Sequence, residues 1–388
     1  MAMPFAFKTS GIVAGLLGGL LLAAICTHTS YILVDCAHKL YYKARKSKMD
    51  YEEVVETAFA TGPEWIRKYA KHARKFVLIW LFFSYFGACV VDNLLISENY
   101  GKVIGYYLDH EYKNSTVEAN VTAPALAAVP VDYSLLRTIM GCLLVPLILF
   151  NWIPDLKYLA PISMIANGFM MIVISITFYY LVLDVKPLNK LSLVASITEF
   201  PQFFSITLFA MENIGVIMPL ENNMKTPRNF LGACGVLNRG MLIITVIYLL
   251  FGVLGYVRYG DQVNEIITTN LRITDVAAQL VMLLIGSTVL FSFGLQFYVC
   301  QQMVWTRVKK YFLNRKILAE YSIRALLVIT CVSIAIALPT IGPLVTLVGA
   351  LGFSILGIIF PAVIELLVYW DIGYGRYKWR LIKNFFLI

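Results

Sequence analysis

Charged residues are scarce in this chain, and no segment is both long and polar enough to form a soluble domain. Only 14% of its 388 residues are Asp, Glu, Lys or Arg, whereas 59% are hydrophobic, and the mean hydropathy is +0.74. This composition excludes an ordinary soluble protein and indicates an all-α polytopic membrane protein embedded in a lipid bilayer. Residues 1–388 are expected to form one transmembrane domain.

The sequence also lacks the residue patterns of several enzyme and metalloprotein classes. It has only four histidines, and its seven cysteines lie in apolar stretches without C-x-x-C spacing, so we interpret them as small packing residues. It contains no G-x-x-x-x-G-K, H-E-x-x-H or G-x-S-x-G motif. These absences argue against an ATP-driven or hydrolytic enzyme, and the sequence predicts no metal and no organic cofactor.

Nine apolar segments are long enough to cross a bilayer as helices. A short apolar stub at residues 1–10 precedes them, and a tail at 371–388 carries a basic cluster and then the start of another apolar stretch. The predicted spans are Gly11–His38, Phe76–Gly105, Tyr133–Ile153, Tyr158–Leu183, Thr198–Leu220, Gly232–Val257, Thr274–Trp305, Ser322–Ile341 and Pro343–Trp370.

The basic residues indicate how these spans are oriented. If residues 39–75, which hold ten Lys or Arg, lie in the cytosol, the alternating inner segments contain 24 of the 32 basic residues. The two N-x-[ST] sequons, at Asn114 and Asn120, then share one outer loop, which predicts that both are glycosylated. Membrane topology thereby explains the net charge of +9, and no nucleic-acid partner is expected.

The segment Glu199–Met224 has the most unusual pattern for a membrane span. It contains Pro201, Gly215 and Pro219, and one acid, Glu212, about 20 Å from its start. An ionisable group at mid-membrane is costly and marks a candidate functional site. The surrounding residues favour a helix break, which frees backbone groups that must line a cavity or meet a ligand. The alternative is a kinked packing helix in which Glu212 pairs with a neighbouring side chain.

The order of the spans predicts an inverted repeat. The stub and four spans precede Thr198, and five spans follow, which gives the odd number per half that such a repeat requires. The first member of each half is the short or interrupted one, with MAMPFAF at 1–7 and FAMENIGVIMP at 209–219. Short or Gly/Pro-interrupted segments in matching positions of two halves point to a transport site.

Several strings along the chain resemble the amino acid/auxin permease family, in its proton-coupled amino acid transporter branch. The longest and most specific is PQFFSITLFAMENIGVIMPLENNMKTP at 201–227; others are AMPFAFK at 2–8, ATGPEWIRKYA at 60–70, LKYLAPISMIAN at 156–167 and GFSILGIIFPAVIEL at 352–366. The resemblance implies a LeuT-like five-plus-five inverted repeat with discontinuous first and sixth helices. It also implies proton-coupled transport of small neutral amino acids such as alanine, glycine or proline, at a plasma, lysosomal or late endosomal membrane.

The chain departs from the family pattern in three places. The family has a half-helix and a Gly-rich turn before AMPFAFK, so the N-terminal half-helix is expected to be incomplete here. The last helix is expected to be incomplete as well, and the chain alone is expected to transport poorly. Asp92 stands within the second span where the family usually has a tyrosine.

The predicted substrate site centres on the helix break. Carbonyl groups freed at Phe209, Ala210 and Met211 are expected to accept hydrogen bonds from a substrate ammonium group. The N–H groups of Asn213–Gly215 open the second half-helix, whose positive end suits a carboxylate. Glu212 is expected to pair with a cation or to carry a proton.

Three further side chains are candidates for the transport mechanism. His28 matches a family histidine linked to proton coupling, and such a residue can relay protons near neutral pH. The alternative for His28 is a hydrogen-bonded packing role. Gln296 and Tyr298 are expected to face the cavity, although such residues in membrane helices are more often packing groups. Four glycines form a small-residue face that is expected to serve helix contact, namely Gly11, Gly15, Gly18 and Gly19.

The sequence therefore predicts a secondary active transporter that works by alternating access, and the family resemblance implies that the proton is the coupling ion. The alternative is a non-transporting amino acid sensor of the same fold, which signals to a partner through cytosolic loops such as 39–75. Substrate uptake into proteoliposomes, with and without a pH gradient, separates the two functions.

Overall fold

The computed structural model describes residues 1–115, 133–153, 156–183, 191–211, 214–232, 234–312, 315–370, 373–374 and 378–387. Over these residues the chain is almost wholly helical and contains no β-strand. Its α-helices are α1 (Met3–Ser10), α2 (Ile12–Ala44), α3 (Tyr51–Thr61), α4 (Glu64–Arg67), α5 (Ala70–Ser115), α6 (Tyr133–Asn151), α7 (Leu156–Leu183), α8 (Phe200–Met211), α9 (Ile214–Asn222), α10 (Val236–Tyr259), α11 (Val276–Val308), α12 (Lys316–Ala337), α13 (Ile341–Leu347), α14 (Phe360–Val368) and α15 (Trp379–Leu387).

Nine helical segments within the described residues are long and apolar enough to cross a bilayer. They confirm the prediction of an all-α polytopic membrane protein. Most of the predicted ends are shifted by a few residues, but α2 continues to Ala44 and α5 runs from Ala70 to Ser115. Hydropathy marks only the part of a helix that lies in lipid, so polar turns that extend a helix beyond the bilayer are missed.

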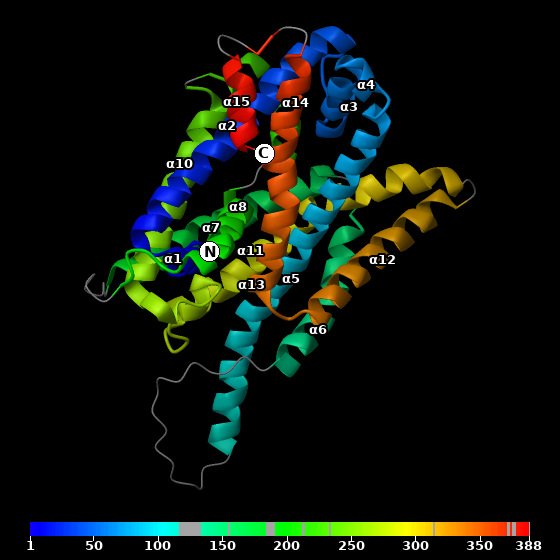
Figure 1. The fold of residues 1–388 in the computed structure, drawn as a ribbon. Helices are drawn as coiled ribbons and strands as arrows, with labels where there is room; N and C mark the ends of the chain where they lie inside the picture. Colours follow the sequence, from blue (N-terminus) through cyan, green and yellow to red (C-terminus); the bar gives the residue numbers. More distant parts are fainter. Residues whose placement is uncertain are drawn as a thin grey trace.

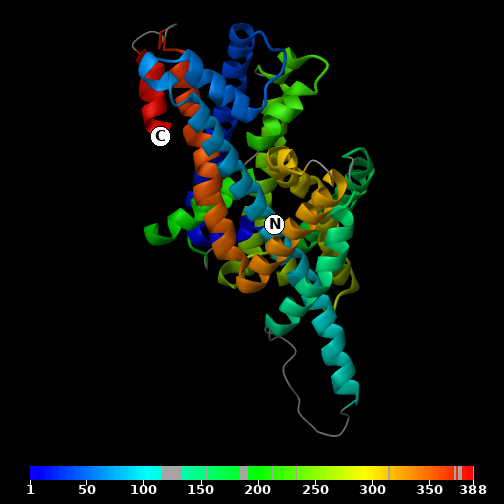
Figure 2. The same cartoon turned by 90° about the vertical axis from the view of Figure 1, so that its right-hand side faces the viewer.

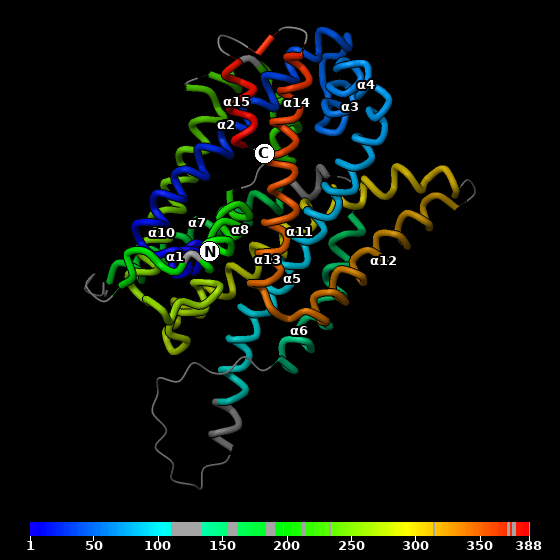
Figure 3. Tube along the Cα trace, in the orientation of Figure 1, coloured from blue at the N-terminus to red at the C-terminus, as the bar shows by residue number. Residues whose placement is uncertain are grey.

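The long helices form one bundle that is traversed by α5 (Figures 1 and 2). Helix α5 packs extensively against α11, which also packs against α7, while α1 packs against α8 and α10. Helices α3, α4 and α15 gather at one end of the bundle with the ends of α2 and α14, at the top of Figure 3. Helix α6 begins toward the opposite end. The charge pattern predicts that the end with α3, α4 and α15 faces the cytosol.

The turn between α1 and α2 depends on Gly11. Its φ of 84° lies in the left-handed region, and a Cβ there would collide with the backbone of Leu193. This close approach lets the Ile12 and Val13 N–H groups donate to the carbonyls of Ser192 and Leu193, at 3.2 and 3.0 Å. The chain that precedes α8 is thereby fixed against the turn.

The small-residue face of α2 serves helix contact, as the sequence predicts. A Cβ at Gly18 would meet the ring of Phe203 on α8, and one at Gly19 would meet Leu249 on α10. Glycine at these two positions lets both neighbouring helices approach the α2 backbone closely.

Residues 39–75 are not a simple loop, contrary to the sequence interpretation. They contain the end of α2, all of α3 and α4, and the start of α5. Four residues of α3 are buried at helical spacing, namely Tyr51, Val54, Val55 and Ala58. The Tyr51 hydroxyl donates to the carbonyl of Leu356, at 2.8 Å, so α3 is anchored inside the bundle. The abundant charges of this segment obscured its short apolar face.

The last span contains two π-helical stretches, η7 (Val348–Phe353) and η8 (Ile355–Ile359), between α13 and α14. Glycine allows the neighbouring helices to approach there. A Cβ at Gly349 would collide with the backbone carbonyl of Ser205 on α8, and one at Gly352 would collide with Ser84 on α5. π-helical turns are rare and often lie at functional sites.

The tail forms α15, which packs against α14. Lys383 lies 2.7 Å from the carboxylate of Glu365, and Arg380 lies 3.8 Å from the same group. Asn384 is buried, whereas Phe385 and Phe386 are exposed. The described part of the tail is thus an amphipathic helix at the bundle surface.

Candidate functional site

The segment that carries the predicted helix break is described as two helices, α8 and α9. Helix α8 ends at Met211 and α9 begins at Ile214. Glu212 and Asn213 lie outside the described residues, so the break itself and the roles of these two side chains stay predictions.

The residues on either side of that position contact three other parts of the bundle. Phe209 packs against Phe353 of η7, with ring centroids 5.7 Å apart. Met211 is 3% exposed, and Ala210 packs against an apolar cluster that includes residues of α1. Gly215, in the first turn of α9, lies so close to α5 that a Cβ would overlap the hydroxyl of Tyr85. The end of α8 and the start of α9 are therefore enclosed by α1, α5 and η7.

Helix α1 lies beside α8, so the two short segments that are predicted to open the halves of an inverted repeat are in contact (Figure 1). Its Phe7 is fully buried. A Cβ at Gly252 of α10 would collide with the Phe7 ring, and one at Gly255 would collide with Pro4. Small residues on α10 thus allow α1 to sit deep in the bundle, next to the candidate site.

His28 lies near the middle of α2 and is half-buried. Its Nε2 atom is sealed from solvent and has no hydrogen-bond partner in the part of the chain that the structure describes. A buried polar atom without a partner is unusual, and a functional role is one explanation for it. The charges of Lys383 and Glu365 act on this imidazole, which places it toward the α14–α15 contact.

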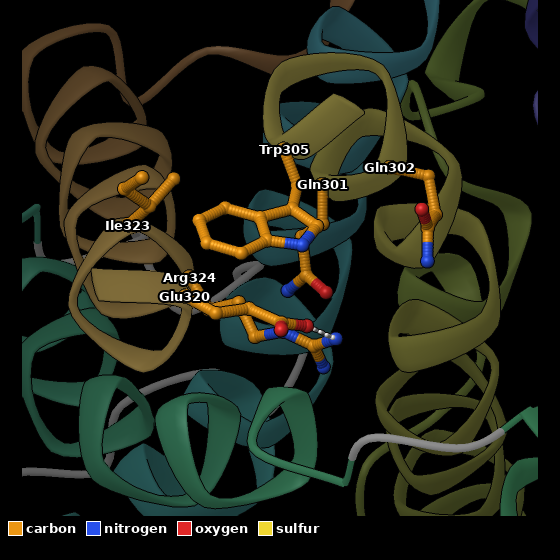
Figure 4. A pocket seen from close by; sticks show the side chains of 6 residues that line it. All are labelled: Gln301, Gln302, Trp305, Glu320, Ile323 and Arg324. Atoms are coloured by element: carbon orange, nitrogen blue, oxygen red, sulfur yellow. Dashed lines mark hydrogen bonds and ion pairs between the residues drawn. The ribbon is translucent and has the colours of Figure 1, made fainter. Parts of the chain in front are cut away.

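Gln296 and Tyr298 both lie on α11 and are half-buried. The Tyr298 hydroxyl accepts a hydrogen bond from Nε2 of Gln302, one turn further along the helix, at 2.7 Å. Gln302 lines a crevice between α11 and α12 (Figure 4). Tyr298 is therefore engaged within its own helix, and a substrate contact by either residue stays a prediction.

The crevice of Figure 4 is built around Arg324 of α12. This residue is 4% exposed; it pairs with Glu320 and donates to the carbonyls of Asn151 and Ile153, both at 3.1 Å. Gln301 donates to the side chain of Asn151 at 3.0 Å. Arg324 thus satisfies carbonyl groups at the end of α6, which makes this crevice a structural joint of three helices.

A polar cluster joins α2 to α9 at the end of the bundle that contains α3. Glu221 of α9 is 1% exposed, and its carboxylate lies 2.7 Å from Nε2 of His38 and accepts a hydrogen bond from the Tyr41 hydroxyl at 2.9 Å. The neighbouring Asn222 donates to the carbonyl of Met49 at 2.9 Å. We call His38, Tyr41 and Glu221 the α2–α9 cluster. In the sequence, only the position of Glu221, an acid near the end of an apolar span, pointed to this cluster.

A pair of acids lies by a cavity of about 160 Å³ near the start of α13. Glu98 of α5 and Glu265, which follows α10, both line it. The Glu265 carboxylate accepts a hydrogen bond from the Gly342 N–H at 2.6 Å, in the first turn of α13. This bond ties the segment after α10 to the helix that leads into η7.

The all-helical bundle, with nine apolar spans among the described residues, defines a polytopic membrane protein. A family profile described as "Transmembrane amino acid transporter protein" matches residues 1–388, and the chain therefore belongs to that family.

Two relatives extend the comparison. The chain is 48% identical over 384 residues to the "Proton-coupled amino acid transporter-like protein pathetic" of Drosophila melanogaster, covering 99% of this chain and 77% of the relative. It is 23% identical over 392 residues to the "Probable amino acid transporter skat-1" of Caenorhabditis elegans, covering 99% of this chain and 81% of the relative.

Proposed function

We propose that this chain is a secondary active transporter that moves small neutral amino acids together with protons by alternating access. Membership in an amino acid transporter family supports the general activity, and the name of the Drosophila relative supports proton coupling. The observation that carries the proposal is the packing of α1 against α8, beside the close contact between Gly215 and Tyr85. In the proposed LeuT-like five-plus-five repeat, these short segments open the two halves and enclose the substrate.

The proposed site divides the two charged groups of an amino acid between two helix ends. Carbonyl groups at Phe209, Ala210 and Met211 receive the ammonium group, since the last carbonyls of a helix lack partners within it. The N–H groups at the start of α9 receive the carboxylate, because the positive end of a helix favours an anion. The close packing of Gly215 on Tyr85 would leave room at this place for a small substrate side chain only.

His28 and Glu212 are the proposed groups for proton movement to the cytosolic side. The unpartnered Nε2 of His28 supports this role, because a free ring nitrogen can accept and release a proton. We further propose that Asn114 and Asn120 are glycosylated on the outer side and that the protein resides in the plasma membrane or in a lysosomal or late endosomal membrane. Asn114 lies in the last turn of α5, and Asn120 lies outside the described residues.

Proteoliposomes test the proposal. Because residues 1–388 cover 77% of the Drosophila relative, all transport assays, including those below, use the chain joined to the residues of that relative that lie outside the matched region. Labelled alanine, glycine and proline should accumulate when the outside is acidic, and a protonophore should abolish the accumulation. His28→Gln and Glu212→Gln should reduce this accumulation and leave exchange of substrate across the membrane intact. Saturable binding without uptake would instead indicate a sensor, and the absence of both binding and uptake would contradict the proposed function.

A further inference from the structure

A single acid, Asp92, lies at the middle of α5, the helix that traverses the bundle. Residues seven apart on a helix share a face, so Asp92 projects from the same side of α5 as Tyr85. Tyr85 lies against Gly215 in the first turn of α9. Asp92 is therefore about 10 Å further along α5 from the candidate substrate site, toward the end predicted to be outside.

The neighbours of Asp92 on this face show that it points into the protein. Ala88, Cys89 and Ile96, one turn away on either side, are 7%, 0% and 0% exposed. Asp92 itself keeps partial exposure, although the residues around it are covered. The Asp92 side chain is therefore directed toward the neighbouring helices rather than toward lipid.

No cation offsets the charge of Asp92 within the described residues, where it has neither a hydrogen bond nor an ion pair. The neighbouring titratable groups are the thiols of Cys89, Cys300 on α11 and Cys331 on α12; thiols are ordinarily neutral at pH 7. The next residue, Asn93, directs its amide to Cys331 at 3.4 Å. An ionised carboxylate in this setting is costly unless a cation or a proton joins it.

We propose that Asp92 binds the proton that is transported together with the amino acid. A neutral amino acid is a zwitterion, so the proton is the only net charge that the substrates bring. When the carboxylate takes a proton from the outer solution, the carrier can close around an uncharged acid. When the site opens inward, the same proton leaves to the cytosol, and the carboxylate is restored. Closure of an ionised, empty site is disfavoured by the desolvation of the charge.

The inference rests on the proposed function, and proteoliposomes at zero membrane potential test both. For one-to-one coupling, a gradient of one pH unit should give about tenfold accumulation of alanine in the unmodified chain. In Asp92→Asn the accumulation ratio should fall to about one, while exchange of alanine between the two sides stays within about twofold of the unmodified chain. Asp109→Asn, a matched change at an exposed position of the same helix, should alter neither.

Each result has a separate meaning. If the unmodified chain neither exchanges nor accumulates alanine, the proposed function fails. If Asp92→Asn still accumulates alanine about tenfold, only the role of Asp92 is refuted. If this variant is monodisperse but loses exchange, Asp92 anchors the substrate instead and the proton role is refuted. If Asp92→Asn does not fold, Asp92→Glu is measured instead. Alanine uptake by Asp92→Glu that is driven by pH, but with a pH dependence displaced from that of the unmodified chain, supports the proposal. An unchanged pH dependence of uptake contradicts it.

Discussion

Replacement of Glu221 by alanine should destabilise the protein strongly, because it breaks the α2–α9 cluster from its buried side. The Glu221 carboxylate is 1% exposed and bonds two partners on α2, the imidazole of His38 at 2.7 Å and the hydroxyl of Tyr41 at 2.9 Å. Removal of the carboxylate leaves both groups facing a site that water does not reach.

The expected loss follows from these two bonds. Hydrogen bonds to a charged group contribute about 1.5–3 kcal/mol each, and loss of one member of a buried pair costs about 3–5 kcal/mol. We therefore expect Glu221→Ala to lower the free energy of unfolding by about 3–5 kcal/mol. Glu221→Gln keeps an acceptor for Tyr41 and should cost about 1–2 kcal/mol. The exposed pair of Lys46 and Glu53, at 3.1 Å, supplies a control, since Glu53→Ala should cost less than about 1 kcal/mol.

Reversible unfolding in mixed detergent micelles measures these free energies. A double-mutant cycle of Glu221→Ala with His38→Ala isolates the contact between the two side chains, and its coupling energy should be about 1–3 kcal/mol. A loss below about 1 kcal/mol in Glu221→Ala, or additive effects of the two changes, would refute the reasoning that this buried cluster holds α9 against α2.

Three further outcomes are expected. Gly349→Ala should abolish or severely reduce folded protein because its Cβ would collide with a backbone carbonyl of α8, whereas Gly168→Ala, with open space around its Cβ, should be neutral or slightly stabilising; yield of monodisperse protein compares them. Glycosidase should increase the gel mobility of protein from eukaryotic cells, and Asn→Gln at both Asn114 and Asn120 should abolish this shift. The topology would be contradicted if a cysteine introduced by Thr116→Cys, in protein at the cell surface, were labelled only after the cells are permeabilised. Burial raises the pKa of Glu52, so its folded form favours the protonated state and α3 should resist proteolysis better at pH 5 than at pH 7.5. The contribution of Glu52 to stability is fully present below its unfolded pKa and is lost as pH rises through the folded value; an equal pH effect in Glu52→Gln would exclude it as the cause.

The sequence predicted the number, order and approximate ends of the spans because lipid imposes a strong hydropathy requirement on each of them. It also located the segment that becomes α8 and α9, since proline, glycine and an acid are conspicuous in an apolar run. Five cysteines are buried packing residues as predicted, but Cys142 and Cys234 are exposed at the bundle surface.

Contacts between distant parts of the chain could not be predicted in the same way. Glu221 meets His38 across 183 positions, and Arg324 reaches the carbonyl of Asn151 across 173. Such pairs produce no recognisable pattern in the sequence, because each member alone is an ordinary polar residue near the end of a span. Helix α3 was missed for a different reason, since its short apolar face is surrounded by charged residues.

The two π-helical stretches before α14 also constrain how this chain can change in length. A π-helical turn holds more residues than an α-helical turn. The lengths of η7 and η8 therefore determine how α14, which follows them, is rotated about its own axis. Insertion of one further residue between 348 and 359 would turn α14 by about 100°. Glu365 would then point away from Lys383, and the carbonyl that Tyr51 now reaches would be displaced. Substitutions away from the contact glycines Gly349 and Gly352 keep the length of this stretch, whereas an insertion would separate the last span from both α3 and α15.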